Sequence, residues 1–136
     1  MSHRTVEVGD QLPGREVRIT RADVVRYAGA STDLNPIHWS DRHARAIGLD
    51  GCIAHGMWTM GAALSQVIEW AGGPEHIAEY FVRFTRPVPV PDDDEGTLVT
   101  FSAQVSDVTE GIATVSIEAL CQDQKVLGAA KAQVRL

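Results

Sequence analysis

Three side chains that could move protons lie close together in the first third of the chain. Asp33, Asn35 and His38 supply a carboxylate, an amide and an imidazole within six residues. Pro36 lies between them, and because proline lacks an amide donor and pushes its predecessor out of the α region, no helix runs through the stretch. A loop that holds an Asp beside a His is suited to proton transfer, since the carboxylate orients an imidazole that titrates near neutral pH. This loop is the first candidate for an active site.

The composition limits what the loop can belong to. With 136 residues, 44% of them hydrophobic, we expect one core and a single domain over residues 1–136. A formal net charge of -6 without a basic stripe argues against a nucleic-acid partner. Cys52 and Cys121 form no CxxC pair, and we expect both to be small buried hydrophobes. Neither the N-terminal residues nor any apolar run has the length of a signal peptide or a bilayer span, which predicts a cytoplasmic protein with no membrane partner.

The first half of the chain reads as helices around the polar loop. Thr20 and Asp23 resemble a capping box for a short helix that Gly29 can end. A second short helix is expected through Ala46, before Gly48. A third, over residues 57–70, carries apolar or small residues on nearly every face, so we expect burial over most of its circumference.

The second half of the chain alternates apolar and polar residues, which is the period of half-buried strands. Tight turns are expected at Glu110-Gly111 and near Asp123, so the strands should form an antiparallel meander. Such a sheet must cover its apolar face, and the helix over residues 57–70 is apolar enough to do so. The pattern therefore predicts an α+β fold in which a curled antiparallel sheet wraps around a long central helix. The expected strands lie at 80–84, 99–105, 113–121 and 126–134.

Three sequence blocks, at residues 27–38, 46–49 and 53–57, together carry a resemblance to a known family. They read YAGASTDLNPIH, AIGL and IAHGM, and in this order the chain resembles the MaoC-like (R)-specific enoyl-thioester hydratases and dehydratases. Within that family it looks closest to the catalytic B subunits of type II fatty-acid synthase dehydratases. The resemblance implies a hotdog fold, no cofactor, and reversible syn dehydration of (3R)-hydroxyacyl thioesters to trans-2-enoyl thioesters. The substrate would be carried by coenzyme A or by an acyl carrier protein.

The same resemblance implies roles for individual residues. Asp33 and His38 would be the catalytic pair, Asn35 would hold the loop, and the backbone N–H of Gly56 would face the thioester oxygen. The chemistry is consistent with these roles, because dehydration needs a base at C2, a group at the leaving hydroxyl and donors for the charged thioester oxygen. We expect His38 to be the base and Asp33 to handle the departing water. A helix N-terminus offers free amides and a positive dipole end, which suits Gly56.

Two other functional classes stay open on the sequence. A non-catalytic acyl-binding hotdog subunit would only stabilise a partner, and the presence of both Asp33 and His38 speaks against it. A hotdog thioesterase would more often take its carboxylate from the central helix, where Glu69 at the far end is the only candidate. Product identity separates the classes: a free thiol for the thioesterase, loss or gain of water for the hydratase, and no product for the binder.

The other polar residues have simpler interpretations. An isolated Asp-x-Asn-Pro segment would be read as a turn, and only the companion blocks favour the catalytic interpretation. His55 is expected to be a structural histidine at the entrance of the central helix, and His43 and His76 to lie on the surface. No metal-ligand spacing is present, so we expect no metal. Arg83 and Arg86 could meet the phosphates of coenzyme A or the acidic face of a carrier protein, although a solvated sheet face explains them equally well.

Thr32 departs from the family pattern, which usually has glycine just before the catalytic aspartate. A β-branched residue resists positive φ, so either the loop avoids that conformation here or its backbone is strained.

A partner chain is also expected. A hotdog module has an open sheet edge and a cleft that a second module completes. The sequence leaves open whether the partner is a second copy, in a homodimer, or another hotdog subunit, in a heterodimer.

Overall fold

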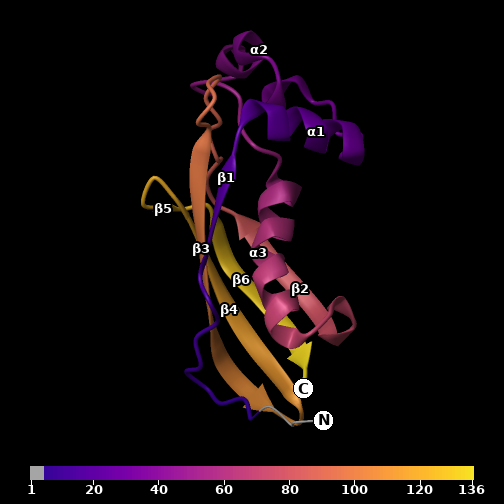
Figure 1. The fold of residues 1–136 in the computed structure, drawn as a ribbon. Coiled ribbons are helices and arrows are strands. Elements are labelled where there is room, and N and C mark those ends of the chain that lie inside the picture. Colours follow the sequence, from indigo (N-terminus) through magenta and orange to yellow (C-terminus); the bar gives the residue numbers. More distant parts are fainter. Residues whose placement is uncertain (1–4) are drawn as a thin grey trace.

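The computed structural model describes residues 5–136 as a six-stranded antiparallel sheet with one long helix against it (Figure 1). The strands follow the order β1-β3-β4-β6-β2, and β5 pairs with β4 outside this path. The strands are β1 (Arg15–Ile19), β2 (Ile77–Phe84), β3 (Thr97–Thr109), β4 (Ile112–Cys121), β5 (Gln124–Lys125) and β6 (Leu127–Arg135). The helices are α1 (Arg21–Ser31), α2 (Asp41–Ala46) and α3 (Gly56–Ala71), with 3-10 turns η1 (Pro36–His38) and η2 (Pro74–His76).

Strands β3 and β4 form the centre of the sheet and confirm the predicted alternation. Every second side chain of β3 from Val99 to Val105 is buried, and so is every second side chain of β4 from Ala113 to Cys121. The turn between them has positive φ at both Glu110 (51°) and Gly111 (76°), as a type I′ hairpin requires. These local signals place one apolar face of the sheet toward α3.

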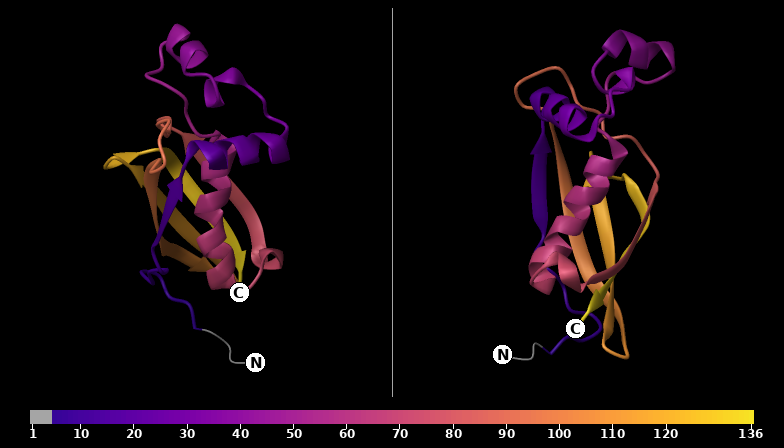
Figure 2. Two further views of the ribbon diagram at one scale, coloured as in Figure 1. Left: turned by 45° about the horizontal axis from the view of Figure 1, so that its top comes forward. Right: turned by 90° about the vertical axis from the view of Figure 1, so that its right-hand side faces the viewer.

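Helix α3 lies in the curl of the sheet, as predicted (Figure 2). Its buried residues, Thr59, Ala63, Gln66 and Val67, follow the spacing of a single helix face. The expectation of burial over most of its circumference was wrong for this chain by itself, because the sheet covers only one side of α3. Met57, at the start of α3, remains 61% exposed.

Helix α1 is longer than predicted. Gly29 lies inside the helix, which ends only where Thr32 adopts the left-handed conformation, at φ 62° and ψ 14°. The predicted capping box is present, because Thr20 and Asp23 each accept a hydrogen bond from the other's backbone N–H. The strained alternative foreseen for Thr32 is thus the one that the structure adopts.

Strand β1 was not predicted, because three of its five residues are charged and its pairing partner lies far along the chain. It pairs with the first half of β3, with Arg15 opposite Phe101 and Ile19 opposite Thr97, and forms one edge of the sheet. Strand β2 forms the other edge, beside β6.

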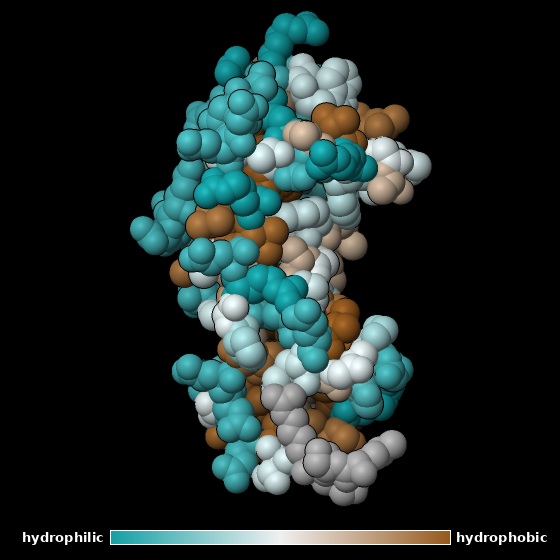
Figure 3. Space-filling model, viewed as in Figure 1, coloured by the Kyte–Doolittle hydropathy of each residue, from teal (hydrophilic) through white to brown (hydrophobic). Residues whose placement is uncertain are grey.

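Residues 32–55, here called the excursion, leave the body between α1 and α3. Figure 1 shows α1 and α2 at one end of the molecule and the C-terminal end of β6 at the other, and Figure 2 shows the excursion rising above the sheet. Hydrophobic side chains gather on the surface around α1 (Figure 3), where Val25 and Leu34 are exposed. Within residues 5–136, every helix is too short or too polar to span a bilayer.

Candidate active site

The last residues of the excursion are held by a short backbone ladder. The amide of Ala54 donates to the carbonyl of Val88 (2.8 Å), and the amide of Val90 donates to the carbonyl of Cys52 (3.0 Å). The amide of Ile53 also donates to the carbonyl of Ile37 in η1, at 3.2 Å. This ladder fixes the start of α3 and the turn that carries His38 against the same piece of backbone.

A half-buried ion pair, here called the Arg21–Asp41 staple, reinforces the ladder. Asp41 Oδ1 accepts hydrogen bonds from the Arg21 guanidinium (2.6 Å) and from the amide of Cys52 (2.9 Å). Arg21 Nε donates to the carbonyl of Val90, at 2.6 Å. The amide of Cys52 and the guanidinium of Arg21 stabilise the carboxylate and lower the pKa of Asp41 to about 2. One carboxylate thus connects α1, α2 and both sides of the ladder.

The loop predicted from Pro36 is a pair of nested Asx turns. Asp33 Oδ1 accepts from the amide of Asn35 (3.2 Å), and Asn35 Oδ1 accepts from the amide of Ile37 (3.3 Å). Asn35 thereby caps η1, which begins at Pro36. The Asp-x-Asn-Pro segment is therefore a turn, and the hydrogen bonds that form this turn are also the ones by which Asn35 holds the loop.

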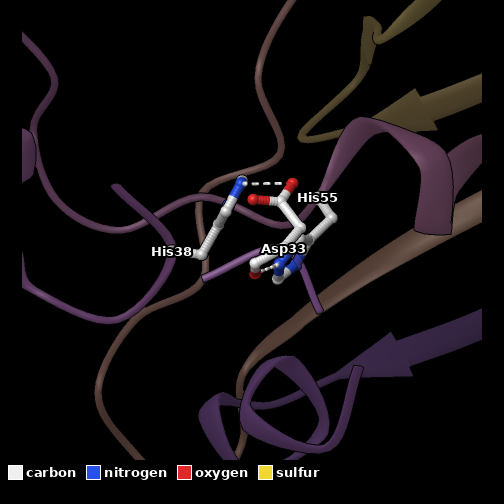
Figure 4. A group of neighbouring side chains, drawn as sticks. All are labelled: Asp33, His38 and His55. Carbon is white, nitrogen blue, oxygen red and sulfur yellow. Dashed lines mark hydrogen bonds and ion pairs between the residues drawn. The ribbon is translucent and has the colours of Figure 1, made fainter. Parts of the chain in front are cut away.

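His38 is the buried member of the predicted pair. Its residue exposure is 6%, whereas the side chain of Asp33 is 52% exposed. His38 Nδ1 lies 2.7 Å from the carbonyl oxygen of Ile53, and since a carbonyl only accepts, Nδ1 carries the proton. The neutral ring then has its lone pair on Nε2, which lies 3.8 Å from Asp33 Oδ2 (Figure 4). The structure therefore brings the two side chains together, and the basic Nε2 of His38 faces the carboxylate of Asp33.

The surroundings of His38 favour the neutral imidazole. Burial lowers the pKa of His38 below its ordinary value of 6.5, and the neighbouring His55 lowers it further. The hydrogen bond to Ile53 and the carboxylate of Asp33 oppose this shift but do not cancel it. At neutral pH His38 is thus ready to accept a proton.

His55 is the site residue whose contacts the sequence did not reveal. Its ring stacks on the ring of His38, with centroids 3.7 Å apart and planes inclined by 19°. Its Nε2 lies 3.0 Å from the backbone carbonyl oxygen of Asp33, and the residue is 2% exposed. The expected position at the entrance of the central helix is confirmed, because His55 is the N-cap of α3. Its place directly before Gly56 was the one local signal that it belongs to the site.

The geometry of the three side chains does not suit a metal ion. Asp33, His38 and His55 offer ligand atoms that all lie within 4.8 Å of one another. A metal bound by imidazole lies near the plane of the ring, at about 2.0–2.1 Å from nitrogen. Two nearly parallel rings stacked 3.7 Å apart cannot both point a lone pair at one ion. The nitrogens that His38 and His55 turn to carbonyl oxygens carry protons, which removes them as ligands.

Gly56 begins α3 next to this cluster and borders a cavity of about 260 Å³. The N-cap of α3 makes no side-chain hydrogen bond to the first-turn amides. A Cβ at position 56 would lie 3.0 Å from the ring of Phe84, so a side chain there would require this exposed ring to shift. Arg86 also lines the cavity, whereas Arg83 lies on β2 with its guanidinium 6.0 Å from the Phe81 ring.

The remaining predicted polar residues lie away from this cluster. Glu69 forms an ion pair with Arg15 near the end of α3, about 20 Å along the helix axis from Gly56. His43 is exposed on α2, and His76 lies in η2 at the far end of α3. Cys52 and Cys121 are free and buried, as predicted.

Comparisons with known proteins place these features in a family. Residues 5–120 match the family model described as "MaoC like domain". Over 79 residues the chain is 40% identical to 3-hydroxyacyl-thioester dehydratase X of Mycobacterium tuberculosis, a stretch that covers 58% of this chain and 27% of that relative. The chain spans about a quarter of that curated relative.

Solved structures agree with the fold. A structure titled "MaoC-like dehydratase" superimposes with a TM-score of 0.92 at 36% identity, covering 96% of this chain and 41% of that chain. The (R)-hydratase from A. caviae involved in PHA biosynthesis gives a TM-score of 0.84 at 25% identity, covering 98% and 99%. The ChsH1-ChsH2 complex from Mycobacterium tuberculosis shares the fold, with a TM-score of 0.83 at 23% identity, covering 97% and 100%.

Proposed function

Because the chain belongs to the MaoC-like domain family, we propose that it catalyses the reversible hydration of trans-2-enoyl thioesters to (3R)-hydroxyacyl thioesters. The observation that carries the proposal is the pairing of His38 with Asp33, in which a neutral, buried imidazole turns its free Nε2 toward an exposed carboxylate. The start of α3, without a side-chain cap, lies next to this pair.

In the dehydration direction, the two side chains divide the work. His38 Nε2 accepts the proton from C2, and the imidazolium that forms is stabilised by the carboxylate of Asp33. Asp33 orients the hydroxyl on C3, and the same proton passes from His38 to that hydroxyl as it leaves as water. Hydration is the reverse, with Asp33 and His38 holding the incoming water.

Charge that develops on the thioester oxygen needs donors that are already in place. The first amides of an α-helix have no partner within the helix and lie at its positive end. In α3 these amides begin at Gly56, whose backbone N–H is the proposed donor to the thioester oxygen. The adjoining cavity supports this role, because it gives the substrate a place beside the amide.

We also propose that the thioester is carried by coenzyme A or an acyl carrier protein and that a second hotdog module, identical or different, adjoins the site. The cavity of about 260 Å³ is below the usual range of ligand sites, about 300–1,000 Å³. A long acyl chain therefore needs additional binding surface, which a second module would supply. Two relatives that are much longer than this chain, and one solved complex of two proteins, are consistent with a second module. Arg86, at the cavity, is a better candidate for carrier contact than Arg83.

The test is hydration of a trans-2-enoyl-CoA by the purified chain, followed by loss of the conjugated absorbance. Asp33→Asn and His38→Ala should each lower kcat by at least about 100-fold, the range for general acid–base groups. His43→Ala, in an exposed histidine of α2, is the matched control and should leave kcat unchanged. Activity that survives both site variants would refute the proposed pair.

Three further outcomes distinguish the alternatives. Activity that appears only after co-expression with a second hotdog chain would make this chain the catalytic part of a heterodimer. No activity, either from the chain alone or after co-expression, would favour the acyl-binding subunit. Release of free thiol would favour the thioesterase. The location of Glu69, about 20 Å from Gly56, does not support the thioesterase.

A further inference from the structure

We propose that His55 is a positioning residue, which holds the backbone of Asp33 and the ring of His38 in the relation that proton transfer requires. This inference rests on the proposed hydration and dehydration. It gives His55 a role beyond its place at the start of α3, and it does not require His55 to touch the substrate.

The first contact fixes the position of Asp33. The carboxylate of Asp33 is half exposed, and the preceding Thr32 is in a strained left-handed conformation. His55 donates from Nε2 to the carbonyl oxygen of Asp33 at 3.0 Å, which ties this exposed residue to an almost fully buried side chain. Without that donor, the loop end would lose an anchor to the protein interior.

The second contact fixes the plane of His38. The hydrogen bond from Nδ1 to Ile53 leaves the ring free to tilt about the bond, and the stacked ring of His55 removes that freedom. On its other side His55 meets the ring of Tyr27, at a centroid distance of 4.8 Å. His55 is thus packed between two rings, and His38 Nε2 is directed toward Asp33.

The hydrogen bonds of His55 also determine which of its two ring nitrogens carries the proton. Its Nε2 carries the proton donated to Asp33, so Nδ1 holds the lone pair, and Nδ1 is buried without a partner among residues 5–136. A proton on Nδ1 would be a buried donor with no acceptor. The titratable groups around His38 are Asp33 and His55, with Tyr27 behind His55, so His38 is the imidazole that takes up the proton.

The first test uses the unaltered chain and needs no activity. Imidazole ¹⁵N NMR should show His38 as the Nδ1–H tautomer and His55 as the Nε2–H tautomer at a pH where both rings are neutral. The opposite tautomer at His55 would overturn the proposal, because the bond to Asp33 would then be absent.

The second test separates the two contacts of His55. His55→Phe keeps a ring to stack but loses the donor, and we expect kcat to fall about 100-fold, as misplacement of a catalytic group by about 1 Å can cause. His55→Gln keeps an N–H donor but loses the ring. We expect the kcat of His55→Gln to be about tenfold higher than that of His55→Phe. The pKa of His38, read by NMR, should rise in His55→Gln, because water replaces the ring of His55. KM should change by less than about threefold in both variants, because His55 does not meet the substrate.

Two results would overturn the proposal. Variants that fold, judged by circular dichroism, and keep wild-type kcat and the wild-type His38 titration would make His55 an ordinary core residue. A KM that rises while kcat stays constant would place His55 in substrate binding instead. Should the unaltered chain add no water to any enoyl thioester, either alone or co-expressed with a second hotdog chain, the proposed function fails, and the NMR tautomers and the titration of His38 still decide the role of His55.

Discussion

Replacing Thr32 with glycine should stabilise the protein. Thr32 ends α1 at φ 62° and ψ 14°, a conformation that costs an L-residue about 1–2 kcal/mol. Glycine avoids this cost, but it lowers the free energy of unfolding by about 0.5–1 kcal/mol because it loses more backbone entropy on folding. The hydrogen bond from the Thr32 hydroxyl to the Ser31 carbonyl is exposed and adds little. The expected gain is about 0.5–1 kcal/mol, or about 2–4 °C in Tm for a domain of this size.

Thermal and urea unfolding at one protein concentration measure this gain, with two comparison variants. Thr32→Ala keeps a Cβ, so it should gain less than Thr32→Gly. Thr100→Gly makes the same substitution at an exposed position within β3 and should destabilise the protein, because no left-handed backbone is relieved there. The reasoning is refuted if Thr32→Gly is no more stable than Thr32→Ala.

Three further predictions follow from single contacts. Asp41→Asn should lower the free energy of unfolding by about 1–2 kcal/mol at pH 7. Since the folded pKa of Asp41 is depressed from 3.8 to about 2, this contribution is present above the unfolded pKa and is lost as pH falls toward 2. Urea unfolding across this range should show the difference in free energy of unfolding between Asp41→Asn and wild type shrinking as pH falls. Asp92→Asn, at an exposed position, should show no such difference. The acid limb of kcat/KM should lie below pH 6.5, because burial lowers the pKa of His38, and a limb above that value in a pH–rate profile would contradict the assignment. Gln66→Met should raise the free energy of unfolding by about 1 kcal/mol in thermal scans, since neither amide atom of Gln66 has a partner within residues 5–136; a loss of stability would show that the amide is hydrogen-bonded in solution.

The sheet and the helices α2 and α3 were predictable because their signals are local. The period of two in β3 and β4, the turn at Glu110-Gly111 and the apolar character of α3 are all written within short windows of sequence. Strand β1 was missed because the alternation of Val17 and Ile19 with charged residues is only five residues long, and its partner β3 lies far along the chain.

The site was predictable only as far as its motifs reach. The blocks that contain Asp33, His38 and Gly56 named residues that the structure brings to one place, although their roles stay proposals. The contacts of His55 were not predictable, because it meets Asp33 across 22 positions of chain through a bond that depends on the whole excursion. The end of α1 was misjudged for the opposite reason, since Gly29 is a local stop signal that the tertiary position of Thr32 overrides.

The excursion has a consequence for how proteins of this architecture can diversify. Its end that carries Asp33 and His38 is bonded to the ladder at Ile37 and Ile53, and the Arg21–Asp41 staple fastens the start of α2. The stretch over residues 42–50, which is largely exposed apart from the buried Ala44, therefore lies between two fixed anchors. Lengthening such a stretch costs little, because the entropy of closing a loop grows slowly with its length. Evolution or a protein engineer can graft a new recognition surface there while the arrangement of Asp33 and His38 is inherited unchanged.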